Sequence, residues 1–263
     1  MPRLEGAPNF RCVSGQTIGN GTRVRVGRIF RSDSLHAISD TDLSTLGQLD
    51  IQLVCDLRGR RERSAYPGRW PKSAKVKMLE LEASRDARAS GHRMYEVMLT
   101  EPTAQRAHAM MIENYKSFPF TLVRPLRALF AILGSETPAL SSPVLIHCAA
   151  GKDRTGFVIA MMLSALRVPR VEILEEYMQT ERRVSLDRRI EDTRSFFARL
   201  AGMMPEEDVL AEIASVDVEF LNAAFASIEN VFGTVDKYLE TACALSRQTR
   251  ERCAAALTDW PGA

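Results

Sequence analysis

Residues 147–155, HCAAGKDRT, contain a cysteine and an arginine separated by five residues, and we call this segment the cysteine loop. A cysteine attacks electrophiles as its thiolate, so Cys148 is a candidate nucleophile. The planar guanidinium of Arg154 can bind two oxygens of one phosphoryl group, a geometry that a lysine ammonium cannot reproduce. The pair therefore favours attack of a thiolate on a phosphate ester bound beside it.

Apolar segments on both sides place the cysteine loop between a strand and a helix. Residues 143–146 form a short apolar run after a Ser-Ser turn, which is typical of a buried central strand. Residues 156–166 are apolar nearly all round and are followed by Pro169, which predicts a buried helix. Exposed amides and the helix dipole meet where a strand leads into a helix, so the loop is expected to bind an oxyanion.

Other residues of the cysteine loop have predicted supporting roles. Gly151 lets the backbone turn so that the loop amides face inward. Thr155 can hydrogen-bond the sulfur, and His147 is expected to hold the loop backbone rather than to transfer protons. The residues predicted to bind phosphate are Ala149, Ala150, Gly151, Lys152, Asp153 and Arg154. A nucleotide-binding loop is excluded because no Ser or Thr follows Lys152 and Ile146 stands where its first glycine belongs.

The same spacing occurs a second time, from Cys55 to Arg61. Its interior, residues 56–60, is rich in charge, and further charges and Pro67 follow without a helix signal. Such a spacing arises easily by chance in a chain with many arginines. We therefore interpret the Cys55 match as a coincidence.

Phosphoryl transfer also needs a general acid to protonate the leaving oxygen, and two aspartates are candidates. Asp153 lies inside the cysteine loop. Asp56 ends an apolar strand predicted over residues 51–57, at the edge where ligands bind in open α/β sheets. The structural alternatives are that Asp56 holds Arg58 or Arg154 in place and that Asp153 only solvates the rim.

The loop resembles that of the protein tyrosine phosphatase superfamily, and more narrowly a bacterial tyrosine/serine phosphatase branch with an HCxxGKDRTG loop. Softer matches fall in the expected order along the chain: Asn9-Phe10-Arg11, residues 27–32, Asp56-Leu57-Arg58 with Glu62, Glu176-Tyr177 with Thr180, Phe220-Leu221 and Tyr238-Leu239. One departure is Arg167, where the branch often has glycine at a helix end. The branch carries the loop aspartate, so the resemblance favours Asp153 over Asp56 as the acid.

The resemblance implies hydrolysis of phosphotyrosine through a phosphocysteine, and the substrate range stays open. Phosphoserine and phosphothreonine are further candidates. Enzymes of the branch whose loops have a lysine and an aspartate at the positions of Lys152 and Asp153 also act on phosphoinositides. The anionic head groups of these lipids favour extra positive charge at the site. The alternative for Lys152 is a solvated rim charge. A basic cluster near Asp56 is either a solvated face or a secondary phosphate contact: Arg58, Arg60, Arg61 and Arg63.

Two classes of protein outside the phosphatases would share parts of this pattern. A phosphate-binding module without activity would bind phosphate and turn over nothing, and the intact Cys148, Arg154 and Thr155 argue against it. A sulfur-transfer protein of the rhodanese kind also places a cysteine in an anion-binding loop. Thiosulfate turnover would identify that class, and the HCxxGKDRTG loop argues against it.

The composition is that of a globular enzyme. With 263 residues, of which 45% are hydrophobic and 26% charged, the chain can form one large core, so a single phosphatase domain is expected over residues 1–263. The net charge of +2 indicates no nucleic-acid partner. Five unevenly spaced cysteines without a CxxC motif argue against disulfides or a zinc site, and the mechanism needs no metal or cofactor.

The N-terminal residues lack an apolar signal region, and no apolar run approaches the ~20 residues of a membrane span. A cysteine nucleophile must stay reduced, which is typical of the cytoplasm. We therefore expect a cytoplasmic protein without an integral membrane segment, although some members of the branch are exported without a recognisable signal.

Strands that alternate with helices predict an α/β fold in which helices flank a mainly parallel sheet. Short strands are expected over residues 9–35, with alternation through 24–26. Ser39 is the expected N-cap of a helix, with Asp42 in the capping-box position. Residues 64–92 are predicted to be irregular, residues 94–117 and 121–134 helical, and all residues after 155 helical.

Residues 181–217 are dense in charge and also carry an apolar strip, and Pro205 divides them into two predicted helices. Such an amphipathic pair could form a lid that excludes water and peroxide from the thiolate. A mycobacterial member of the resembling branch has a two-helix cover of this kind. The alternatives are an ordinary helix pair packed on the sheet and a dimer face.

Overall fold

The computed structural model describes residues 2–19, 21–71, 76–82, 102–135, 143–200 and 204–259. A five-stranded sheet has the order β1-β2-β5-β3-β4. Its strands are β1 (Arg11–Val13), β2 (Ile29–Ser32), β3 (Leu53–Asp56), β4 (Lys77–Glu80) and β5 (Val144–His147). Within the described residues only β1 is antiparallel to its neighbour, so the predicted mainly parallel sheet is confirmed. The strand β5 lies at the centre, as its uniformly buried residues require.

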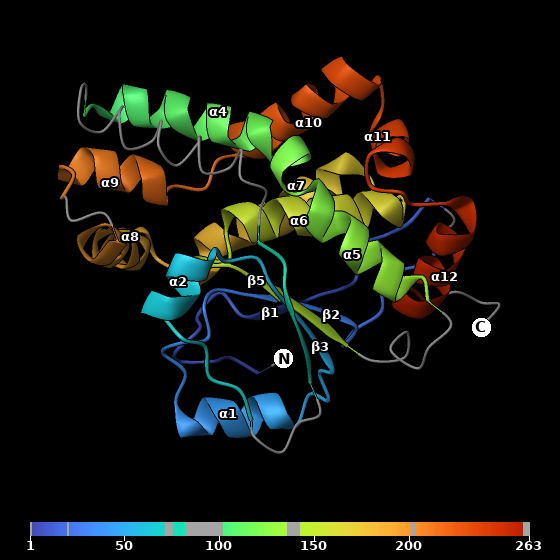
Figure 1. Ribbon diagram of the computed structural model, residues 1–263, viewed down its shortest axis with the longest axis horizontal. Coiled ribbons are helices and arrows are strands. Elements are labelled where there is room, and N and C mark those ends of the chain that lie inside the picture. Colours follow the sequence, from blue (N-terminus) through green and yellow to red (C-terminus); the bar gives the residue numbers. More distant parts are fainter. Residues whose placement is uncertain are drawn as a thin grey trace.

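The sheet is covered unequally on its two faces (Figure 1). On one face lies α1 (Asp40–Gly47), where Leu46 belongs to a small cluster with Phe30, Val54 and Leu145. The opposite face, with Ile29, Cys55 and Ile146, carries the main hydrophobic core. Successive strand residues therefore alternate between two cores, and every strand residue of β2, β3 and β5 is buried.

Helices from residue 104 onward build most of the main core in the described part of the chain. They are α4 (Ala104–Thr121), α5 (Val123–Leu133), α6 (Asp153–Ala165), α7 (Arg170–Arg183), α10 (Val218–Phe232), α11 (Val235–Thr241) and α12 (Arg247–Leu257). The helix α6 contacts β2 and β5 directly, and ten of its thirteen residues are buried. It is thus the central helix that the apolar run after the cysteine loop predicts.

Three further helices lie outside the main core. They are α2 (Arg60–Ala65), α8 (Leu186–Leu200) and α9 (Glu207–Ala214). The helix α8 contacts both α2 and α9, and α9 contacts α4 (Figure 1). The predicted division of residues 181–217 into two helices is therefore confirmed, with Pro205 between α8 and α9.

Several expected boundaries differ from the observed ones. The strand β4 lies within residues 64–92, which the sequence indicated as irregular, because its side chains are mostly exposed and give no apolar pattern. The helix predicted over 94–117 is observed as α4, and residues 94–101 lie outside the described part of the chain. In the segment 24–26, where alternation predicted a strand, Val24 forms an isolated bridge to Thr258. Because Thr258 takes part in this bridge, the residues after 155 are not all helical, contrary to the prediction.

Two local predictions at helix ends are informative. Ser39 caps α1, and Asp42 completes the capping box, as expected. Arg167 follows α6 with a φ of +64°, a left-handed conformation that glycine adopts most easily. The structure thus explains why glycine suits this position and why arginine there affects only a helix end.

None of the described helices combines the length and the apolar character needed to cross a lipid bilayer.

Candidate active site

The backbone of the cysteine loop has its carbonyl groups turned outward. The amide of Ser34 donates to the carbonyl of Ala149 (2.8 Å), and Asn9 Nδ2 donates to the carbonyls of the next two residues (3.0 and 3.1 Å). Arg31 Nη2 also donates to the carbonyl of Gly151 (2.6 Å). In a trans peptide the N–H points opposite to the C=O, so the amides after these carbonyls face inward, where an anion can bind.

Gly151 is required where the loop passes the end of β2. Its φ is +63°, and a Cβ atom there would lie 2.3 Å from the carbonyl oxygen of Ser32. A larger residue would therefore both strain the backbone and push the loop away from the sheet. This agrees with the turn predicted at Gly151.

Five buried residues, which we call the rear cluster, hold the loop from behind: Asn9, Arg11, Arg31, Glu176 and Thr180. Glu176 accepts hydrogen bonds from Arg11 Nε (2.8 Å) and Arg31 Nη1 (2.7 Å), and Arg11 also binds Asn9 and Thr180. Burial alone would raise the pKa of Glu176, but the two guanidinium groups hold this pKa below its usual value. The softer sequence matches to the resembling branch thus include the residues that orient the loop.

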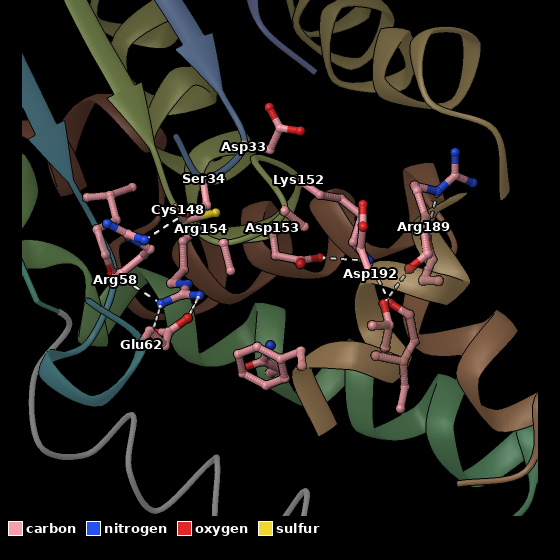
Figure 2. Close-up of a pocket in the computed structure, with 18 of the residues that line it drawn as sticks. Asp33, Ser34, Arg58, Glu62, Cys148, Lys152, Asp153, Arg154, Arg189 and Asp192 are labelled. Atoms are coloured by element: carbon pink, nitrogen blue, oxygen red, sulfur yellow. Dashed lines mark hydrogen bonds and ion pairs between the residues drawn. The ribbon is translucent and has the colours of Figure 1, made fainter. Parts of the chain in front are cut away.

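Cys148 lies on the floor of a cavity of about 1310 Å³, lined by the cysteine loop and by residues of α2, α4 and α8. The residue is 2% exposed. Figure 2 shows Cys148, Asp153 and Arg154 on the loop, with Glu62 below Arg154 and Asp192 of α8 on the other side. The structure thus brings the predicted nucleophile and the predicted phosphate-binding arginine to one cavity.

Glu62 of α2 binds both terminal nitrogens of Arg154, at 2.7 Å each. The same carboxylate accepts a hydrogen bond from the amide of Gly59 (2.7 Å) and so caps α2. Burial would raise the pKa of Glu62, but the charge of Arg154 holds it below its usual value. The sequence gives this pair no signal, because its members lie 92 residues apart.

Asp56 lies at the end of β3, as expected, but its carboxylate is fully engaged. Arg58 donates to Oδ1 through Nε (2.9 Å) and to Oδ2 through Nη2 (2.7 Å). His147 Nε2 lies 3.7 Å from Oδ2. The Asp56 side chain is 4% exposed and is not among the residues that line the cavity. Burial would raise its pKa, yet the bonds from Arg58 hold that pKa below its usual value.

Asp153 begins α6 and lines the cavity, with its side chain 24% exposed. Its Oδ1 accepts a hydrogen bond from the hydroxyl of Tyr115 (2.8 Å), which is buried on α4. The Tyr115 hydroxyl also hydrogen-bonds that of Tyr177 (2.7 Å). Tyr115, itself held by Tyr177, therefore fixes the Asp153 carboxylate from the buried side of the cavity wall. No sequence pattern indicated Tyr115.

Lys152 is not the solvated rim charge that the sequence allowed, because it is 3% exposed. Its ammonium donates to the carbonyls of Ile213 (2.7 Å) and Ser215 (2.8 Å) at the end of α9. It also lies 3.2 Å from Asp153 Oδ1. Lysine thus joins the cysteine loop to α9, because the carbonyls at a helix C-terminus attract a cation.

The two supporting residues at the ends of the loop are both buried. His147 Nδ1 lies 3.4 Å from the carbonyl oxygen of Cys148, the kind of backbone contact that was expected. Burial lowers the pKa of His147 to about 4, so the ring is neutral at neutral pH. The Oγ1 atom of Thr155 is buried, with no hydrogen-bond partner among the described residues.

The Cys55 match needs one correction. The sequence indicated no helix after Cys55, but the structure has one, α2, after β3, so this expectation was wrong. Its first residues are arginines, which hide the pattern. Cys55 nevertheless lies inside β3 rather than after it, and burial raises the pKa of its thiol to about 12. It is therefore a core residue.

Asp33 lines the same cavity, although the sequence did not single it out. It directly follows β2, at the carboxyl end of a parallel strand, and this position could have indicated it. Burial raises the pKa of its carboxyl to about 7. In Figure 2 its side chain points away from Cys148.

The family model described as the tyrosine phosphatase family matches residues 2–259. The triple specificity protein phosphatase PtpB of Mycobacterium tuberculosis is 32% identical over 265 residues, covering 91% of this chain and 92% of that protein. A Cupriavidus necator protein, provisionally named a tyrosine-protein phosphatase, is 31% identical, covering 89% of this chain and 81% of its own length. The crystal structure of Pseudomonas aeruginosa TpbA is 19% identical, with a TM-score of 0.32, covering 80% of this chain and 94% of that one.

Proposed function

The chain belongs to the tyrosine phosphatase family and is a protein-tyrosine phosphatase, and from that premise we propose that it acts through a phosphocysteine on Cys148. One observation carries the proposal: Cys148 and Arg154 share the floor of one cavity, on a loop whose carbonyls are held outward. Inward amides and a guanidinium stabilise the charge that develops on the phosphoryl oxygens during transfer.

In the first step the Cys148 thiolate attacks phosphorus, and the bond from phosphorus to the leaving oxygen breaks. The loop amides and Arg154 hold the phosphoryl group in line with the sulfur. Glu62 accepts hydrogen bonds from both terminal nitrogens of the Arg154 guanidinium. A phosphoryl group that binds at the loop therefore competes with Glu62 for Arg154.

We propose Asp153 as the general acid, in preference to Asp56. Asp153 faces the cavity, and Tyr115 and Lys152 fix its carboxylate beside the loop. Asp56 has both oxygens bound to Arg58 and lies behind the cavity wall, which supports a structural role for it. Asp153 thus gives its proton to the leaving oxygen in the first step. In the second step it accepts a proton from the water that breaks the sulfur–phosphorus bond.

The proposed substrates are phosphotyrosine proteins, with phosphoserine and phosphothreonine as further substrates. The name of the mycobacterial relative, a triple specificity phosphatase, supports the wider range. A phosphoinositide substrate has less support, because the ammonium of Lys152, which was to attract a head group, is bonded to α9. We also keep the cytoplasm as the proposed location, since all five cysteines are free thiols.

The test measures phosphate release from phosphotyrosine, phosphoserine and phosphothreonine peptides and from phosphoinositides. Cys148→Ser should abolish all turnover, and acid quenching of the wild type should trap phosphate on Cys148. Cys55→Ala is the matched control, since it removes the other cysteine with the same spacing to an arginine, and it should retain activity. EDTA should have no effect. Turnover that survives Cys148→Ser, or a strict metal requirement, would contradict the mechanism.

A further inference from the structure

The arginines near Asp56 separate into two kinds in the structure. Arg58 is buried and bound to Asp56, and Arg63 pairs with Glu80 (3.1 Å). Arg60 and Arg61 are exposed on α2, and no acidic side chain pairs with either within the described part of the chain. The cluster in the sequence therefore contains two structural arginines and two that face solvent unpaired.

The fold adds a third unpaired arginine from a distant part of the chain. Arg199, near the end of α8, lines the same shallow hollow as Arg60 and Arg61, together with Ser64. The helices α2 and α8 lie side by side (Figure 1). The Arg199 guanidinium lies over the ring of Tyr66, 4.7 Å from its centroid, and no acidic side chain pairs with it within the described residues. Three like charges brought together without a counter-charge repel one another unless an anion binds.

This hollow adjoins the catalytic cavity. Arg199 lines both, and Tyr66 lines the cavity from the same side. Tyr66 is itself fixed to α8, because its hydroxyl donates to the carbonyl of Ser195 (3.1 Å). A substrate with its phosphate on the cysteine loop could therefore extend past Tyr66 to the three arginines.

We propose that Arg60, Arg61 and Arg199 form a second anion subsite, which binds an acidic side chain or a second phosphate on a peptide next to the hydrolysed phosphotyrosine. The subsite deepens the proposed function and rests on it. A peptide fits better than an inositol head group, because a compact head group lies within one hollow, whereas an extended chain can occupy both. Bidentate guanidinium groups suit carboxylate and phosphate equally.

The test compares three substrates: a small aryl phosphate, a phosphotyrosine peptide with flanking Asp and Glu residues, and the same peptide with Asn and Gln instead. The variant is Arg60→Ala, Arg61→Ala and Arg199→Ala combined. We expect kcat/KM for the acidic peptide to fall roughly tenfold, at about twofold to threefold for each exposed charge contact. Turnover of the aryl phosphate and the neutral peptide should stay unchanged. High salt should remove the preference of the wild type for the acidic peptide.

A charge-matched control removes three exposed arginines outside the two hollows, Arg23, Arg124 and Arg182, and should leave the preference intact. Equal losses in the two triple variants would show a general charge effect and overturn the subsite. A soluble inositol bisphosphate is tested as a fourth substrate, and a loss confined to it would assign the arginines to head groups and overturn the peptide proposal. Failure of the wild type on the aryl phosphate would instead overturn the proposed function.

Discussion

The two sides of the cysteine loop are built in opposite ways. Behind it, the rear cluster is wholly buried, and its charges pair through Glu176 with two arginines. In front of it, α2 and α8 present Arg60, Arg61 and Arg199 to solvent without acidic partners among the described residues. The rear therefore fixes where the loop amides point, whereas the exposed arginines in front remain available to a bound anion.

The largest effect should come from breaking the rear cluster. Glu176→Gln leaves Arg11 and Arg31 buried without a counter-charge, which we expect to lower the free energy of unfolding by about 3–5 kcal/mol. Activity should be lost as well, because Arg31 also holds the carbonyl of Gly151. Urea unfolding and kinetics measure both effects. The exposed neighbour Glu175→Gln should be close to neutral in both, and equal effects of the two variants would contradict the distinction between rear and front.

A smaller effect should appear as a pH dependence of stability. The pKa of His147 in the folded protein is about 4, below its value of about 6.5 in the unfolded chain. The unfolded state therefore binds more protons between these pH values, and the stability present above pH 6.5 is lost as the pH falls toward 4. We expect a loss of about 2–3 kcal/mol from this residue.

Chemical unfolding at several pH values, with His147→Gln beside the wild type, measures this contribution. The variant should lose less stability than the wild type between pH 6.5 and pH 4. Parallel curves for the two proteins would show that His147 is charged or solvated in the folded state.

The smallest effect should come from Tyr115, which links the buried interior to the open cavity. Tyr115→Phe removes the hydrogen bond to Asp153, and we expect kcat to fall about tenfold for phenyl phosphate, whose leaving group needs a proton. A p-nitrophenyl ester, with a better leaving group, should be affected much less.

Tyr238→Phe is the matched control, since its hydroxyl is also buried and hydrogen-bonded, to the carbonyl of Pro119 (2.8 Å), but lies outside the cavity. It should change stability without any dependence on the leaving group. If Tyr115→Phe slows both esters equally, Tyr115 supports the structure and does not position the acid.

The sequence predicted the parts of this site that are local in the chain. The apolar runs around the cysteine loop indicate β5 and α6, and the loop itself contains Cys148 and Arg154. The end of β3 was also found, because buried parallel strands are apolar throughout. Exposed β4 and the charged helix α2 were missed, since neither has the periodicity of a half-buried element.

The contacts that the sequence did not predict are those between residues far apart in the chain. Glu62 reaches Arg154, and Tyr115 reaches Asp153, from helices that only tertiary packing brings near. The sequence left two interpretations of Lys152, a charge beside the phosphate and a solvated rim charge, and only the position of α9 shows that its ammonium is buried and bonded. Residue types and spacing therefore predict which residues react better than they predict which residues orient them. The lid role of residues 181–217 and the single domain over 1–263 stay predictions.

The carbonyls at the end of α9 receive their hydrogen bonds from other elements. Lys152 donates to Ile213 and Ser215, and Arg189 of α8 donates to Ala214 (2.8 Å). The end of α9 is therefore tied to the cysteine loop through Lys152, so a displacement of this lysine would remove two of the hydrogen bonds that the helix end accepts. A fluorescent amino acid in place of exposed Glu206, at the opposite end of α9, would sense such a displacement without occupying the cavity.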